Sequence, residues 1–212
     1  MKVNMLTIAI DDNDAFYQHG MEILLQDIFH NENFETIHFD KLTVANSIKV
    51  DIIIKSFIRG EEYVCHPSLK FRNKSGLIIG VYESNKKPMF TELPSCIKNI
   101  VFITRNEPIN HVMQTIIDAW RSRPAPDELK FYRKCLLCRR RTVTEKQYSI
   151  SRLIIRGYDT QQIAQNLNLS EKTISAHKRI IMMKFNLNSD AELVMFLNNL
   201  RTNSRPVNLF CT

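Results

Sequence analysis

At 212 residues, with 44% hydrophobic and 24% charged residues, the chain has the length and composition of one large or two modest globular domains, which excludes wholesale disorder and a fibrous architecture. No apolar stretch approaches the roughly 20 residues that cross a bilayer, and five scattered cysteines do not match a secreted disulfide framework, so we expect a cytoplasmic protein with free thiols. Residues 1–120 carry 12 basic and 15 acidic side chains, whereas residues 121–212 carry 17 basic and 7 acidic ones, so the positive excess lies in the second part and indicates an anionic partner there.

The first 120 residues alternate short apolar runs with amphipathic segments. The apolar runs predict buried strands over 6–10, 51–54, 77–82 and 100–104. Helices are predicted over 16–29 and 109–120, while the weakly periodic stretch 60–75 contains a proline, so a helix there is expected to be short or missing. Strands that alternate with helices predict a receiver-like α/β fold, a doubly wound parallel sheet.

A basic segment separates this pattern from a second one. Residues 121–141 contain two prolines and eight basic side chains, so we interpret 121–142 as a linker. The predicted domains are therefore 1–120, a helical domain over 143–203 and a tail over 204–212. Cys135 and Cys138 have the spacing of half a zinc site, but no second pair of ligands follows at a suitable distance, so no metal is predicted; sensitivity of these thiols to oxidation stays open.

From residue 142 the pattern is all-α, and the ends of four helices can be located. The start signals are the T-x-x-Q capping box of Thr144 and Gln147, the N-cap Ser170, and the S-x-x-E capping box of Ser189 and Glu192. Gly157 suits the left-handed end of the first helix, and a second helix is predicted over 160–167. The predicted third helix runs from the Ser170 cap to about residue 185.

The third helix has two different faces. Ile174, Ile181 and Phe185 are spaced close to whole turns and can anchor one side in the core. The opposite side carries a polar, small and cationic stripe of Lys172, Ser175, Ala176 and Arg179. The major groove of DNA admits a helix with such a stripe, where Arg179 suits guanine and Ala176 suits the methyl group of thymine. Lys178 and Lys184 would add attraction to phosphates, whereas an ordinary solvated helix surface is the alternative interpretation of the stripe alone.

Enzymatic chemistry has no support in the sequence. The chain has five glycines and no glycine-rich phosphate loop, and its six histidines are dispersed, with no arrangement that suggests an activated nucleophile. We therefore predict that the protein is not an enzyme and uses no cofactor.

The stretch VTEKQYSISRLIIRGYDTQQIAQNLNLSEKTISAHKRIIMMKFNL resembles the helix-turn-helix of the LuxR/NarL/FixJ family, and the match extends from Val143 to about Leu200. The resemblance implies that residues 170–184 form the recognition helix. It assigns Ser175, Ala176 and Arg179 to positions that face bases, and Lys172, Thr173 and His177 to positions near the DNA backbone. Gln147 and Ser149 stand where the family usually has glutamates.

The segment IAIDDNDAFYQHGMEILL resembles the start of a response-regulator receiver domain, in which Asp11 and Asp12 would hold Mg²⁺. The rest of that pocket is degenerate. Ser56, preceded by Lys55, stands where the family has the phosphoacceptor aspartate, and Thr104, with Arg105 next to it, stands where the family has a lysine. A serine is not an equivalent nucleophile, so we predict a pseudo-receiver that is not switched by aspartyl phosphorylation, with the two aspartates as solvated strand-end carboxylates.

A basic recognition helix behind a degenerate receiver is similar to the RcsA and BglJ group of auxiliary regulators, which pair with the response regulator RcsB. The sequence therefore predicts a DNA-binding transcription regulator that binds two half-sites about one helical turn apart, as a homodimer or as a heterodimer with an RcsB-like regulator. An interaction protein that titrates a related regulator without reading DNA is the alternative. A true phosphorylation-controlled switch is a third hypothesis.

Overall fold

The computed structural model describes residues 5–32, 34, 36–72, 76–83, 92–97, 99–123 and 140–202. The chain divides into two compact units, the first formed by Met1–Phe57 and His66–Cys138 and the second by Ile58–Cys65 and Arg139–Thr212. No helix in the described ranges is long and apolar enough to cross a membrane. Cys135, Cys138 and most of the predicted linker lie outside the described residues.

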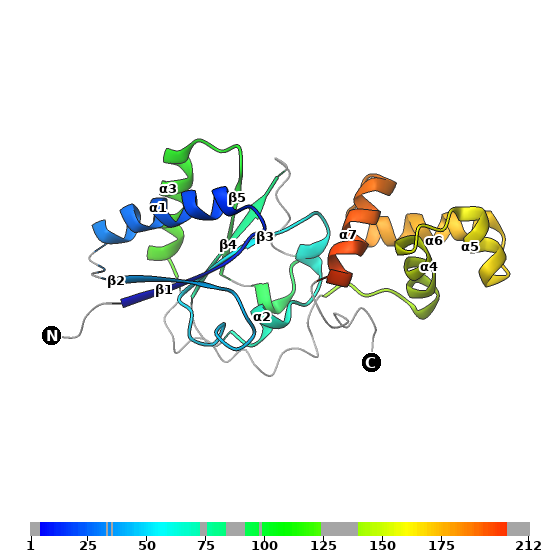
Figure 1. The fold of residues 1–212 in the computed structure, drawn as a ribbon, viewed down its shortest axis with the longest axis horizontal. Coiled ribbons are helices and arrows are strands. Elements are labelled where there is room, and N and C mark those ends of the chain that lie inside the picture. Colours follow the sequence, from blue (N-terminus) through cyan, green and yellow to red (C-terminus); the bar gives the residue numbers. More distant parts are fainter. Residues whose placement is uncertain are drawn as a thin grey trace. The chain divides into compact units, whose positions relative to one another are not determined.

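The first unit contains a five-stranded, fully parallel sheet with the strand order β2-β1-β3-β4-β5 (Figure 1). Its strands are β1 Met5–Asp11, β2 Thr36–Lys41, β3 Ile52–Ser56, β4 Leu77–Tyr82 and β5 Ile100–Thr104. All six residues of β4 and the first four of β3 are buried, because these central strands are covered on both faces.

Helices α1 (Ala15–Asn31) and α3 (Ile109–Arg121) cover one face of the sheet, as Figure 1 shows. Phe29 and Trp120 meet edge to face in this core with ring centroids 5.1 Å apart. The short helix α2 (Pro67–Lys70) and the 3-10 turn η3 (Ser95–Ile97) contribute to the apolar cluster on the other face. The predicted doubly wound α/β architecture is therefore confirmed.

One strand of this sheet differs from the sequence prediction. Strand β2 was not predicted, because it is an edge strand in which Ile37 and Phe39 are only half-buried and no continuous apolar run marks it. In the described part of residues 60–75 the structure has only the 3-10 turn η1 (Glu61–Tyr63) and the four residues of α2, which agrees with the expectation that a helix there is short or missing.

The described residues of the second unit form α4 (Glu145–Ile155), α5 (Thr160–Leu167), α6 (Glu171–Lys184) and α7 (Asp190–Thr202). Both hydrogen bonds of the Thr144–Gln147 capping box are present, and Gly157 has φ +84° after α4 as predicted. Ser189 accepts from the Glu192 backbone N–H at 3.1 Å, but the Glu192 carboxylate accepts from the Asn188 N–H instead of closing the box on Ser189.

The segment Ile58–Cys65 belongs to this second unit, which the sequence did not indicate. Gly60 has φ +92°, and a Cβ at this position would lie 3.0 Å from Leu187 Cδ2 and 3.0 Å from the Phe185 carbonyl oxygen. Asn199 Nδ2 donates to Glu61 Oε2 at 2.9 Å. A side chain at position 60 would therefore be strained by the backbone conformation and crowded by these neighbours.

Candidate nucleic-acid interface and strand-end pocket

Helix α6 is held by its start and by one buried face. The Ser170 hydroxyl accepts from the Thr173 N–H at 3.1 Å and fixes the first turn. Asn168, with φ +51°, reverses the chain between α5 and α6. Ile174 and Ile181 are fully buried, and Ile174 packs with Ile150 of α4 in the core of the unit. The orientation of α6 about its own axis is therefore fixed.

The opposite face of α6 carries the predicted stripe. Lys172, Ser175, Ala176 and Arg179 are all exposed. Thr173 is half-buried at the first turn, where its hydroxyl lies 2.8 Å from the hydroxyl of Ser170. An exposed, convex helix face with small residues between two cations has the shape and charge that a major groove accepts.

Three other residues proposed for DNA contact, His177, Lys178 and Lys184, are only partly exposed. Lys178 is largely buried, with 19% of its side chain exposed, and its Nζ lies 2.8 Å from Asp190 Oδ2. His177 is half-buried, and its Nδ1 has no hydrogen-bond partner among the described residues.

Lys184 departs furthest from the expected phosphate contact. Its Nζ donates to Gln147 Oε1 at 3.0 Å and to the Thr142 carbonyl at 3.1 Å, which ties the end of α6 to the start of α4. The periodicity of α6 alone does not reveal this, because the partners of Lys184 are about 40 residues earlier in the chain. Lys184 thus supports the fold and does not belong to the exposed stripe.

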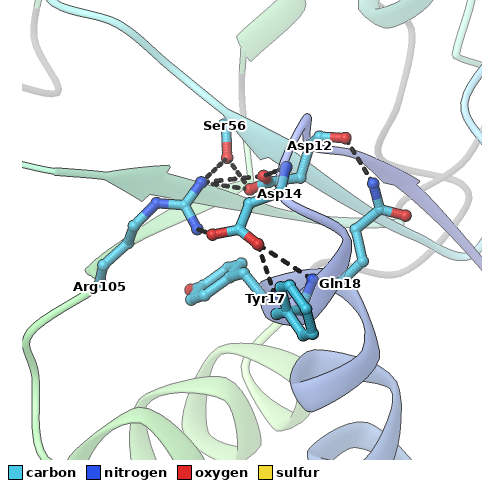
Figure 2. Close-up of polar contacts among 7 residues, drawn as sticks. Asp12, Asp14, Tyr17, Gln18, Ser56 and Arg105 are labelled. Carbon is cyan, nitrogen blue, oxygen red and sulfur yellow. Dashed lines mark hydrogen bonds and ion pairs between the residues drawn. The ribbon is translucent and has the colours of Figure 1, made fainter.

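A second polar cluster lies where β1, β3 and β5 end (Figure 2). Arg105 Nη2 lies 2.9 and 2.7 Å from the two carboxylate oxygens of Asp12 and 3.3 Å from Ser56 Oγ. Ser56 Oγ donates to Asp12 Oδ2, and the Asp14 N–H donates to Asp12 Oδ1 at 2.8 Å. Only 1% of the Asp12 side chain is exposed, so this carboxylate is neutralised inside the protein by Arg105.

Lys55 and Asp11 form a second ion pair, with Lys55 Nζ 2.8 Å from Asp11 Oδ2. The two residues are partners in the parallel register of β1 and β3, so the sheet itself brings them together. Lys55 is 5% exposed and Asp11 is 41% exposed, so the pair stands at the edge of the core. Asp12 is therefore not the solvated strand-end carboxylate that the sequence suggested, whereas Asp11 remains partly exposed.

The electrostatics of the cluster follow from these contacts. Burial by itself raises the pKa of Asp12, but hydrogen bonds from Ser56, the Asp14 backbone and Arg105 outweigh it and lower the pKa below its usual 3.8. Burial raises the pKa of Tyr17 to about 12, and the Arg105 guanidinium lies 4.0 Å from the centre of its ring.

Arg105, and not Thr104, completes this cluster. Side chains alternate along a strand, so Thr104 points to the same face as Phe102, whereas Arg105 follows Ile103 toward the α1 face. Thr104 is 4% exposed at the end of β5. Ile103 faces the α1 side of the sheet, so the alternation of side chains places Arg105, two residues later, on the same side. This alternation is the signal in the sequence that could have selected Arg105.

The cluster does not fit a divalent metal ion. Within the described ranges, no group of three or more His, Cys, Asp or Glu side chains is arranged to hold a metal. A Mg²⁺ site of the receiver type needs carboxylate oxygens that are open to the ion, yet both oxygens of Asp12 already accept hydrogen bonds.

Comparisons with known proteins agree with the two-part organisation. Residues 141–197 match the family described as bacterial regulatory proteins, luxR family. The oxygen regulatory protein NreC of Staphylococcus carnosus is 43% identical over 56 residues, which are 26% of this chain and 26% of that protein. The chain thus matches about a quarter of the length of this curated relative.

Solved structures of RcsB share the fold of nearly the whole chain. An RcsB–DNA complex aligns with a TM-score of 0.55 and 19% identity, covering 93% of this chain and 100% of that one. RcsB from Salmonella enterica serovar Typhimurium, bound to a promoter in the presence of phosphomimetic BeF3⁻, aligns with a TM-score of 0.57 and 17% identity, covering 93% and 99%. The comparisons therefore show a luxR-family match over residues 141–197, preceded by an α/β fold that is shared with the RcsB structures.

Proposed function

We propose that the chain is a sequence-specific DNA-binding transcription regulator that reads bases through Ser175, Ala176 and Arg179. The exposed stripe on α6, set opposite the buried Ile174, carries this proposal. The luxR-family match over 141–197 and the DNA-bound state of its RcsB fold neighbours support it.

Each residue of the stripe suits a different contact. The guanidinium of Arg179 can pair with O6 and N7 of one guanine, and Ala176 is small enough to reach a thymine methyl group. Lys172 stands in the first turn, where a cation contacts a phosphate and adds salt-dependent, sequence-independent affinity. Lys178 and Lys184 are engaged within the fold and act by holding α6 in place.

A selection from random duplex DNA tests the proposal. The wild-type chain, alone or mixed with RcsB, is expected to enrich a defined motif, and the triple variant Lys172→Ala, Ser175→Ala, Arg179→Ala is expected to lose it. The double variant Arg152→Ala, Arg156→Ala also removes two positive charges from exposed positions of the same unit, and it is expected to keep the motif. A triple variant that keeps the motif would contradict the assignment, as would a control that loses it to the same extent.

The alternative, a chain that titrates a related regulator without reading DNA, makes a different prediction. The triple variant would then leave control of the target genes intact and would still capture the partner. Because the same variant is used, reporter expression in the native host separates the two functions.

We further propose that the chain acts as a dimer, with itself or with an RcsB-like regulator, on two half-sites about one helical turn apart. The fold likeness to RcsB, for which a structure of two dimers bound to DNA is known, supports this. Sedimentation of the chain alone, of RcsB alone and of their mixture distinguishes homodimer, heterodimer and monomer.

Aspartyl phosphorylation has no place in this proposal. Ser56 stands at the end of β3 and donates a hydrogen bond to Asp12, and a serine at this position is not a carboxylate nucleophile. Incubation with acetyl phosphate and Mg²⁺ is expected to give no phosphoryl adduct by mass spectrometry, whereas RcsB in the same tube serves as a positive control.

A further inference from the structure

We propose that Arg105 and Lys55 are permanent internal cations that replace the metal ion of a receiver pocket, so that the pocket excludes Mg²⁺. This inference rests on the proposed function, because it names how the receiver-like domain escapes control by phosphorylation. It concerns a different site from the reading face of α6, so the two can fail separately.

The carboxylate of Asp12 has no acceptor capacity left for a metal. It accepts from the Asp14 N–H, from Ser56 Oγ and, with both oxygens, from Arg105 Nη2. A carboxylate offers about four lone-pair sites, and these contacts fill them. Mg²⁺ could bind there only by displacing the guanidinium.

Arg105 has little freedom to leave. Its guanidinium lies over the ring of Tyr17 at 4.0 Å, and its Nη1 is 3.9 Å from Asp14 Oδ2. Asp14 is itself engaged as the N-cap of α1, where it accepts from the N–H groups of Phe16 and Tyr17. Moving Arg105 would break these contacts and leave Asp12, with 1% of its side chain exposed, as an unpaired anion.

Lys55 neutralises the second carboxylate in the same way. Its Nζ lies 2.8 Å from Asp11 Oδ2 and 5.4 Å from the centre of the Phe57 ring, and its side chain is 5% exposed. The two aspartates and the two internal cations balance in charge. The Asp12–Arg105–Ser56 contacts join the ends of β1, β3 and β5, which in a receiver would be joined through the metal and the acceptor.

Thermal unfolding of the full chain tests this inference through Trp120. This is the chain's only tryptophan, and it is buried in the α1 and α3 core of the first unit, so its emission follows that unit. Millimolar MgCl₂ is expected to leave the wild-type midpoint within about 1 °C of a NaCl control at equal ionic strength. A larger stabilisation by MgCl₂ overturns the proposal without any variant.

The variant Arg105→Met tests whether Mg²⁺ binds once the guanidinium is removed. It is expected to unfold several degrees lower than wild type in NaCl and to regain part of this loss in MgCl₂, because Asp12 is then open to a cation. The matched control Arg156→Met, an exposed arginine of the second unit, is expected to behave as wild type in both salts. An Arg105→Met midpoint that does not fall, or that MgCl₂ does not raise, contradicts the proposal.

Arg105→Gln covers the case in which Arg105→Met does not fold. A glutamine removes the charge but keeps an N–H donor group, so a Mg²⁺ response between those of wild type and Arg105→Met is expected. No Mg²⁺ response in a folded Arg105→Gln chain counts against the proposal. The DNA selection described above is carried out with Arg105→Gln as well, and loss of the motif in the α6 triple variant alone separates the two proposals.

Discussion

Lys184 donates to the side-chain carbonyl of Gln147 at 3.0 Å, and the same oxygen accepts from the Thr144 N–H at 3.0 Å. One amide oxygen therefore closes the capping box of α4 and anchors the last turn of α6. A family-typical glutamate at position 147 would make the same contacts with a charge, and the amide here makes them without one.

Replacing Lys184 by Met should lower the stability of the second unit by about 1.5–3 kcal/mol, the usual contribution of a hydrogen bond to a charged group. Lys172→Met removes the same charge from an exposed position of the same helix and should change stability by less than about 0.5 kcal/mol. Urea unfolding followed by helical circular dichroism measures both. Equal stability of the two variants would show that the Gln147 contact contributes nothing.

Arg179→Ala should weaken binding to the selected motif by about 1–3 kcal/mol and relax the preference at a single base pair. Arg179→Lys should recover little of this loss, because an ammonium group lacks the planar pair of donors. Lys172→Ala should instead reduce affinity for all sequences and lower the salt slope by about 1. Binding titrations at several NaCl concentrations on matched and mismatched duplexes separate the two behaviours.

The Asp12 contacts should make the first unit sensitive to acid. Burial acts to raise the pKa of this carboxyl, but hydrogen bonds from Ser56, Asp14 and Arg105 outweigh it, so the folded-state pKa lies below the usual 3.8. The stabilisation is therefore present above pH 3.8 and is lost as the pH falls through the folded-state pKa. Asp12→Asn should be less stable than wild type at neutral pH, and the difference in free energy of unfolding, followed by Trp120 emission, should shrink below pH 3.8. Asp27→Asn, which removes an exposed carboxylate on α1, is the control measured beside it.

Two glycines of the first unit should respond in opposite directions to alanine. A Cβ on Gly80 in β4 would lie 2.5 Å from Phe102 Cδ1, so Gly80→Ala should destabilise the unit by about 1–3 kcal/mol through overpacking. A Cβ on Gly20 in α1 would meet nothing within 4 Å, so Gly20→Ala should stabilise the unit by about 0.5–1 kcal/mol through helix propensity. Denaturant titrations followed by Trp120 emission compare the two.

The sequence predicted those strands and helix ends whose signals lie within a few neighbouring residues. The apolar runs located β1, β3, β4 and β5, and the Thr144–Gln147 box placed the start of α4, because each signal lies within a few residues of its effect. Strand β2 was not predicted because its half-buried apolar residues, Ile37 and Phe39, alternate with exposed polar ones. An edge strand can have this pattern, and it contains no continuous apolar run.

Long-range contacts account for the differences at the candidate sites. Lys184 has the charge of a phosphate ligand, and its partner Gln147 is 37 residues away in sequence. Arg105 lies one residue beyond the position that the resemblance selected, and its pairing with Asp12 joins residues 93 apart. Such pairings depend on which face of a strand each side chain occupies, and a shift of one residue reverses that face.

The pairing of Asp12 with Arg105 has a consequence for how such a chain could carry information. A carboxylate that a kinase or a small phosphodonor modifies stores a past event for the lifetime of the acyl phosphate. Under our proposal this pocket has Ser56 in the place of that carboxylate and Arg105 on its buried aspartate, so it stores no such event. Under our proposal, the amounts of the protein and its partner, set by synthesis and degradation, then determine how often a promoter is occupied.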